Sequence, residues 1–167
     1  MTTPTNPVVN IADIPLVDRG HGDKFAVLWG RVGHLIGMKG LGCALHVVPP
    51  GKRAFPYHVH HANEELFLIL AGTGEYRFGD NTYPIKAGDL LAAPPGGPEA
   101  AHQITNTGAV EMRYLGISTM ISPEAVDYPD SGKFAVFSRP DPGGDLRKAG
   151  LRYIGRRDST LDYWDGE

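Results

Sequence analysis

The chain has 167 residues, which is enough for one domain with its own hydrophobic core and too few for a second full domain. Its formal net charge is −3 and its 16 Lys and Arg residues are scattered along the sequence, so we expect no nucleic-acid partner. The longest apolar run, residues 66–71, falls far short of the ~18 residues that span a bilayer, so we also expect no membrane segment.

Cysteine usage and the first residues bear on the compartment. Cys43 is the only cysteine, so an internal disulfide is excluded. Residues 1–10 carry neither a basic segment nor the apolar stretch of a signal peptide. We therefore expect a cytoplasmic protein.

The chain is predicted to begin with an arm and to continue as an all-β domain. Residues 1–24 show no convincing hydrophobic pattern, and we expect them to lie on the domain or to fray. From residue 25 to 119, short β-type runs recur about every ten residues and end at Gly, Pro, Asn or Asp. This spacing is typical of an antiparallel sandwich or barrel. The predicted strands are residues 25–32, 41–48, 57–60, 65–70, 75–78, 82–85, 90–93, 102–106 and 110–119.

The pattern changes after residue 119, and residues 120–167 are predicted to form a C-terminal arm. Ser122-Pro123-Glu124 indicates a short helix or turn, residues 133–138 a further strand, and residues 141–145 a loop. This arm is too rich in aromatic residues for a disordered tail, so we expect it to pack on the barrel or on a second subunit. The aromatic residues are Tyr128, Phe134, Phe137, Tyr153, Tyr163 and Trp164.

A cluster of histidines and one carboxylate predicts a metal site. His58 and His60 share one face of a strand because alternate side chains point the same way, with their Cα atoms roughly 6.5–7 Å apart. Glu65 begins the next strand after a short turn, which returns its carboxylate to the histidine pair. His102 shares its parity with Ile104 and is expected on the inner face of a strand across from them. Three imidazoles and a carboxylate are a suitable ligand set for one divalent ion such as Zn, Ni, Mn or Fe.

The same alternation separates neighbouring residues that carry similar chemistry. His61 and Glu64 are predicted to face away from the ion. The alternative is that these histidines are unrelated surface or core residues, as most single histidines are. Three histidines within residues 57–62, directly before an acidic pair, favour the metal site over that alternative.

These residues resemble the two motifs of the cupin superfamily. Gly51, His58-Val59-His60, Glu65 and Gly72 follow the order of the first motif. Gly88, Pro94-Pro95-Gly96, His102 and Asn106 follow the order of the second. The resemblance implies a cupin-type β-barrel, also described as a double-stranded β-helix or jelly roll, and a homodimer. The final residues 163–167 are also similar to the end of small single-domain bacterial cupins that are loosely called sugar-phosphate-isomerase-like.

The second motif departs from the family spacing and leaves two residues in competition for the fourth ligand position. Five residues instead of two separate Gly96 from His102, so Glu99 stands where simple counting places the family histidine. We favour His102, because its distance to Asn106 is kept and a loop insertion costs little. Glu99 would then lie near the mouth of the barrel and is our candidate catalytic base.

Several further residues are candidates for the site by strand order. Tyr57 is a second candidate for moving a proton, and His46 is expected to line the lumen. Arg53 and Arg113 are candidates to bind an anionic substrate through paired hydrogen bonds. The alternative for each is a rim or surface residue with no part in the chemistry.

Three functions fit such a site. Four protein ligands leave open positions on the ion, which favours an enzyme over a closed structural metal site. The first hypothesis is a metal-dependent isomerase or lyase for a small sugar-phosphate-like or keto acid-like compound. The second is an Fe(II)-dependent dioxygenase, and the third is a non-catalytic small-molecule-binding protein. The identity of the metal discriminates between them.

Overall fold

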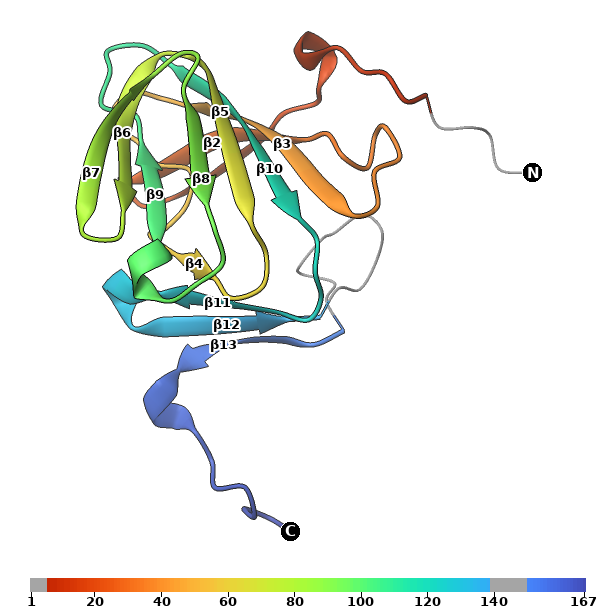
Figure 1. Cartoon of the computed structure of the whole chain (residues 1–167), viewed down its shortest axis with the longest axis vertical. Coiled ribbons are helices and arrows are strands. Elements are labelled where there is room, and N and C mark those ends of the chain that lie inside the picture. The colour runs from red at the N-terminus through yellow and green to blue at the C-terminus, as the bar shows by residue number, and fades with distance from the viewer. Residues whose placement is uncertain (1–5, 139–149) are drawn as a thin grey trace.

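Two antiparallel sheets form the body of the protein and enclose its main core (Figure 1). The computed structural model describes residues 6–138 and 150–167. The larger sheet has the strand order β1 (Val17–His21), β2 (Phe25–Arg31), β3 (Leu41–Val48), β10 (Met112–Thr119), β5 (Glu65–Ala71) and β8 (Leu90–Ala93). The smaller sheet has the order β7 (Asn81–Lys86), β6 (Thr73–Phe78) and β9 (His102–Thr105). This architecture confirms the predicted jelly-roll barrel.

Side chains alternate between the two faces of each strand, and those on the inner faces form the core between the sheets. On β5, Phe67 and Ile69 are buried whereas Leu66 and Leu70 are exposed on the opposite face. The buried residues that pack together include Val27, Val48, Phe67, Ile69, Tyr76, Ile85, Leu91, Ile104, Met112 and Tyr114. The turn from β5 to β6 requires Gly72, because its φ is +83° and a Cβ there would lie 2.8 Å from the Met112 Cα.

A third sheet lies across one end of the barrel (Figure 1). Its order is β13 (Arg152–Arg156), β12 (Lys133–Phe137), β11 (Glu124–Tyr128) and β4 (Val59–His60). Val126, Ala135 and Phe137 are buried together beneath it. Because β4 pairs with β11, the C-terminal segment is joined directly to the strand that carries the histidine pair.

The predictions outside the barrel were partly wrong. The segment at Ser122-Pro123-Glu124 was predicted to start a helix or turn, but Glu124 begins β11, whose burial alternates along the strand. Strand β1, which pairs with β2, was not predicted either, because all its residues are exposed and it has no apolar face. Strand β13 was missed in the same way, and the loop predicted at 141–145 lies outside the described residues.

The two predicted arms differ in how far they pack on the barrel. The N-terminal one buries Ile14 against Leu45 and Val47 on the outer face of β3. At the C-terminus, Tyr163 and Trp164 are 85% and 71% exposed and contact each other, so coverage of these two rings by a second subunit stays a prediction. Short 3-10 helices occupy Ile11–Asp13 (η1), Pro98–Ala100 (η2), Pro129–Ser131 (η3) and Arg157–Ser159 (η5). Within the described ranges, no helix is long and apolar enough to cross a membrane.

Candidate metal centre

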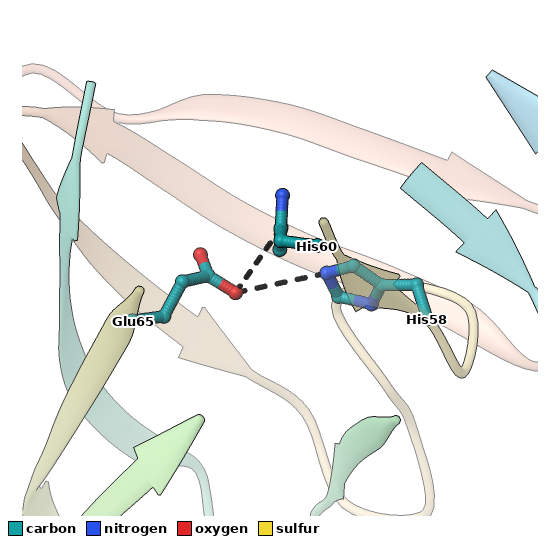
Figure 2. Close-up of side chains that lie close together, drawn as sticks. All are labelled: His58, His60 and Glu65. Carbon is teal, nitrogen blue, oxygen red and sulfur yellow. Dashed lines mark ion pairs between the residues drawn. The ribbon is translucent and has the colours of Figure 1, made fainter. Parts of the chain in front are cut away.

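His58, His60 and Glu65 converge at the end of the barrel that faces the third sheet (Figure 2). One ligand atom from each lies within 4.8 Å of the others. His60 lies on β4, His58 stands directly before it, and Glu65 is the first residue of β5. Their side chains meet because strand alternation places both imidazoles on one face and the short 61–64 turn returns the chain beside them.

One carboxylate oxygen of Glu65 is the focus of the cluster. Its Oε2 lies 3.0 Å from His102 Nε2, 3.3 Å from His60 Nε2 and 3.8 Å from His58 Nε2. The structure therefore brings all four predicted ligands to one place. His58, His60 and Glu65 form the group compact enough to share an ion, and His102 contacts it through Glu65.

The tautomer of His58 shows why this donor set fits a cation. Its Nδ1 lies 2.8 Å from the Pro56 carbonyl oxygen, which can only accept, so Nδ1 carries the proton. Nε2 then presents a lone pair toward the Glu65 carboxylate. Two electron-rich atoms that face each other repel, and a divalent ion between them removes that repulsion.

The protonation states of the cluster agree with this interpretation. Burial lowers the pKa of His58 to about 3, so its imidazole is neutral. Burial alone would raise the pKa of Glu65, but hydrogen bonds from His102 and His60 hold it well below its usual range. Burial likewise lowers the pKa of His60, yet Glu124 and Glu65 raise it to about 9 overall. A metal ion would replace the proton held at His60, since ligands must be deprotonated to bind.

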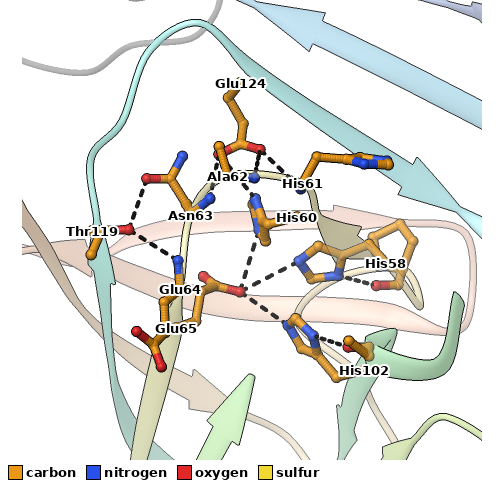
Figure 3. A network of polar contacts seen from close by, with 12 residues as sticks. His58, His60, His61, Ala62, Asn63, Glu64, Glu65, His102, Thr119 and Glu124 are labelled. Atoms are coloured by element: carbon orange, nitrogen blue, oxygen red, sulfur yellow. Dashed lines mark hydrogen bonds and ion pairs between the residues drawn. The ribbon is translucent and has the colours of Figure 1, made fainter. Parts of the chain in front are cut away.

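Glu124 supports the cluster from the third sheet, and the sequence analysis missed it (Figure 3). Its carboxylate accepts hydrogen bonds from the backbone N–H groups of His61, Ala62 and Asn63, at 3.2, 3.3 and 3.1 Å. Its Oε2 also lies 3.8 Å from Nδ1 of His60, a buried nitrogen without a hydrogen-bond partner. Glu124 therefore holds the turn that joins the two ligand-bearing strands.

The residues predicted to face away do so. The ring of His61 points outward and its Nε2 lies 3.0 Å from Asp127 Oδ2. Glu64 is exposed, and its backbone N–H donates to the Thr119 hydroxyl. The alternation therefore separates His60 from His61 and Glu65 from Glu64, as predicted.

Tyr128 is a second residue near the site that the sequence analysis did not assign to it. Its ring stacks on His58, with centroids 6.2 Å apart and planes inclined by 26°. Tyr128 is half-buried, and burial raises the pKa of its phenol. The available signal was the alternation of Glu124, Val126 and Tyr128, which the predicted helix or turn obscured.

The two predicted proton-moving groups lie away from the cluster. Glu99 sits in η2, where it is exposed and its Oε1 accepts from the Gly97 N–H at 2.9 Å. Tyr57 is buried, its hydroxyl donates to the Gly79 carbonyl, and the Arg77 guanidinium lies 3.6 Å from its ring centroid. The structure does not bring either side chain to the ligand group, so their catalytic roles stay predictions.

The predicted substrate-binding residues are divided between the two faces of the barrel wall. His46 is buried inside it, stacked on Tyr114 at 4.6 Å, with its Nδ1 unpartnered. Arg53 donates from Nε to the Thr105 hydroxyl at 3.2 Å. Arg113 alternates with the buried Met112 and Tyr114, which places it on the outer face of β10. Of the two that lie on named strands, His46 faces the barrel interior and Arg113 faces away from it.

A family model and two curated proteins match the middle part of the chain. A family model described as the Cupin domain matches residues 44–118. An oxalate-binding protein of Thermotoga maritima is 31% identical over 74 residues, which is 44% of this chain and 58% of that protein. An (S)-ureidoglycine aminohydrolase of Arabidopsis thaliana is 46% identical over 66 residues, or 40% of this chain and 21% of that protein. The matched residues therefore span 58% of the first of these relatives and 21% of the second, which is less than two thirds of either protein.

Solved structures extend the similarity to nearly the whole chain. A putative sugar phosphate isomerase from Acidithiobacillus ferrooxidans superposes with a TM-score of 0.76 at 25% identity, over 91% of both chains. A sugar phosphate isomerase of the cupin superfamily from Silicibacter pomeroyi gives 0.74 at 21% identity, over 95% of this chain and 98% of that chain. A predicted oxalate decarboxylase from Thermotoga maritima gives 0.59 at 26% identity, over 68% of this chain and 99% of that one.

Proposed function

The chain belongs to the cupin superfamily, and we propose that it is a metal-dependent isomerase or lyase for a small sugar-phosphate-like or keto acid-like compound. One observation carries the proposal: a single oxygen of Glu65 is faced by imidazole nitrogens of His58, His60 and His102 within 3.8 Å. The side chains of His58, His60 and Glu65 remain 15–20% exposed, so the group is open to a small molecule.

A bound divalent ion would act as a Lewis acid on a carbonyl or hydroxyl group of the substrate. His58, His60 and Glu65 would hold it, and we keep His102 as the predicted fourth ligand. Glu124 would fix the ring of His60, and the stacked ring of Tyr128 would limit how a substrate approaches beside His58. The apolar core behind Phe67 keeps water from the inner side of the centre.

Tyr128 and Glu99 are the two groups that we compare for the proton-transfer role, and the role of Tyr57, whose hydroxyl donates to the Gly79 carbonyl, stays a prediction. The phenol of Tyr128 belongs to the side chain that contacts His58, whereas Glu99 can act only if η2 turns its carboxylate away from the Gly97 N–H. Glu99→Gln and Tyr128→Phe should separate them. The variant that loses kcat while it retains metal identifies the group.

Non-catalytic binding of a small dicarboxylate is the second candidate function. The oxalate-binding relative from Thermotoga maritima favours it by its name. A bound ion and a small carboxylate ligand without turnover would establish this alternative.

The test begins with metal content. His58→Ala, His60→Ala and His102→Ala should each lose stoichiometric metal while the barrel stays folded, because apolar strands supply its core. His61→Ala is the matched control, since its ring faces Asp127. Full occupancy in His58→Ala and His60→Ala would refute the metal site.

The metal and the substrate screen then assign the reaction. Zinc, nickel or manganese with turnover of sugar phosphates or keto acids, and without oxygen uptake, supports the isomerase or lyase. Bound iron together with oxygen uptake would instead support the Fe(II)-dependent dioxygenase.

A further inference from the structure

A hollow outside the metal centre lies beside the ends of β11, β12 and β13. Its volume is about 370 Å³, within the ~300–1,000 Å³ range of small-molecule sites. One wall is Pro98 of η2 and another is Tyr128. The residues that line it are Pro98, Asp127, Tyr128, Pro129, Gly132, Lys133, Arg156, Arg157 and Asp158.

The sheet register aligns this hollow with the metal centre. Lys133 is directly opposite Tyr128 on one side and directly opposite Arg156 on the other. Residues directly opposite on neighbouring strands share a face, so these three side chains form one row. The row continues to His58, whose ring stacks on Tyr128. With ~4.8 Å between neighbouring strands, the backbone of Lys133 is roughly 10 Å from the strand of the histidine pair.

The charges of the row are unusual. Like charges directly opposite on neighbouring strands are destabilising, yet Lys133 and Arg156 occupy such a pair. Among the residues that the structure describes, neither forms an ion pair with a carboxylate. The Lys133 ammonium lies 5.6 Å from the Tyr128 ring centroid, and the Arg156 guanidinium donates to the Ser131 carbonyl.

The acidic residues of the hollow leave part of this positive charge uncompensated. Asp127 receives Arg157 Nη2 at 2.7 Å and His61 Nε2 at 3.0 Å on the same oxygen. Asp158 is the other carboxylate in the lining. Apart from the paired Asp127 and Arg157, the lining therefore contains two positive charges, on Lys133 and Arg156, and one further carboxylate, that of Asp158.

We propose that this hollow binds the anionic group, a phosphate or a carboxylate, of the compound whose other end reaches the metal centre. An anion between Lys133 and Arg156 would remove their repulsion and receive charge-assisted hydrogen bonds from both. The ring of Tyr128, between Lys133 and His58, would contact the carbon body of the compound. This inference rests on the proposed function for the metal centre but assigns the specificity to residues outside it.

The test measures anion binding to protein that has been stripped of metal with a chelator, so that no ion can hold the anion. Titration with inorganic phosphate and, separately, with acetate by calorimetry should show binding of at least one of them. Lys133→Gln and Arg156→Gln should each weaken it about tenfold, the loss expected for one hydrogen bond to a charged group. Lys39→Gln is the matched control, because Lys39 is exposed and lies outside the hollow.

A thermal measurement gives an independent readout. Without anion, Lys133→Gln should melt above the parent protein because it removes the repulsion with Arg156. With phosphate or acetate, whichever binds, the parent should gain stability and the variant should not. A destabilised variant in anion-free buffer would overturn the account of the pair.

The outcomes separate this inference from the proposed function. Binding of neither anion to the metal-free protein, or equal binding by all three variants, would overturn the anion site and leave the metal chemistry intact. The opposite outcome is also possible to recognise. If Lys133→Gln and Arg156→Gln lose anion binding, the anion site is supported. If the parent protein also binds no metal under any condition, the proposed function is refuted.

Discussion

Glu124 and Glu65 face opposite nitrogens of the same imidazole: Glu124 Oε2 lies 3.8 Å from His60 Nδ1, and Glu65 Oε2 lies 3.3 Å from His60 Nε2. A carboxylate behind a ligating histidine orients the ring and raises its basicity. Glu124 belongs to the C-terminal segment and Glu65 to the barrel. A strand outside the cupin match of residues 44–118 therefore supports the candidate metal centre.

Glu124→Gln should weaken metal binding by ~10–100-fold, the usual effect of removing such a partner. The amide oxygen can still accept from the backbone N–H groups of His61 and Ala62, so the fold should persist. Competition with a chelator measures the affinity. Asp127→Asn is the control, since Asp127 faces His61 on the other side of β11. Equal losses in the two variants would contradict the assigned role of Glu124.

Glu65→Gln and Glu64→Gln should differ sharply in metal affinity. Glu65 is at the focus of the cluster, whereas Glu64 is exposed on the opposite side of the strand. We expect Glu65→Gln to lose more than the ~10–100-fold typical of residues that only orient a ligand, and Glu64→Gln to bind normally. Metal content after dialysis checks this. Similar losses in both would mean that strand alternation does not select the ligand.

His46 should make the metal-free protein sensitive to acid. Burial lowers its pKa to about 4, below the 6.5 of a free histidine. Between these values the unfolded chain takes up a proton and the folded one does not, so stability falls as the pH drops from 6.5 to 4. The complete effect is about 3 kcal/mol.

His46→Phe removes the titrating group and keeps a ring against Tyr114. Urea unfolding at pH 7 and pH 4.5 should show a smaller loss in the variant than in the parent protein. Parallel losses would mean that other groups cause the acid sensitivity.

Two C-terminal truncations should have opposite results. Ending the chain after Thr119 removes Glu124 and the buried Phe137, so metal binding should be lost and the protein should aggregate. Ending it after Asp162 removes only the exposed Tyr163 and Trp164 among the aromatic residues, and the melting temperature should change by no more than about 2 °C.

Metal content and thermal melting distinguish the two truncations, and sedimentation compares their association with that of the intact chain. A folded, metal-loaded protein after truncation at Thr119 would show that the third sheet is dispensable. A large fall in melting temperature after truncation at Asp162 would mean that a second subunit covers the terminal rings.

Local patterns in the sequence predicted most strands of an antiparallel sandwich or barrel and the faces of the candidate ligands, and the resemblance to the cupin motifs selected the barrel. The period of two residues along each strand predicted the faces of His58, His60 and Glu65, and the turn residues between runs predicted where most barrel strands end. Both depend on residues close together in the chain. The alternation also predicted that His61 and Glu64 point away.

Only the tertiary structure decided which distant residues complete the site. Glu124 reaches the 61–64 turn, and Tyr128 reaches His58, because β11 pairs with β4 from more than sixty residues away. The pairing of β12 with β11 and β13 puts Lys133 and Arg156 in line with the candidate metal centre. The Glu99 carboxylate is exposed and accepts from the Gly97 N–H. Strand alternation specifies the face on which a side chain lies, but the partner of that face depends on long-range pairing, which leaves no short-range pattern.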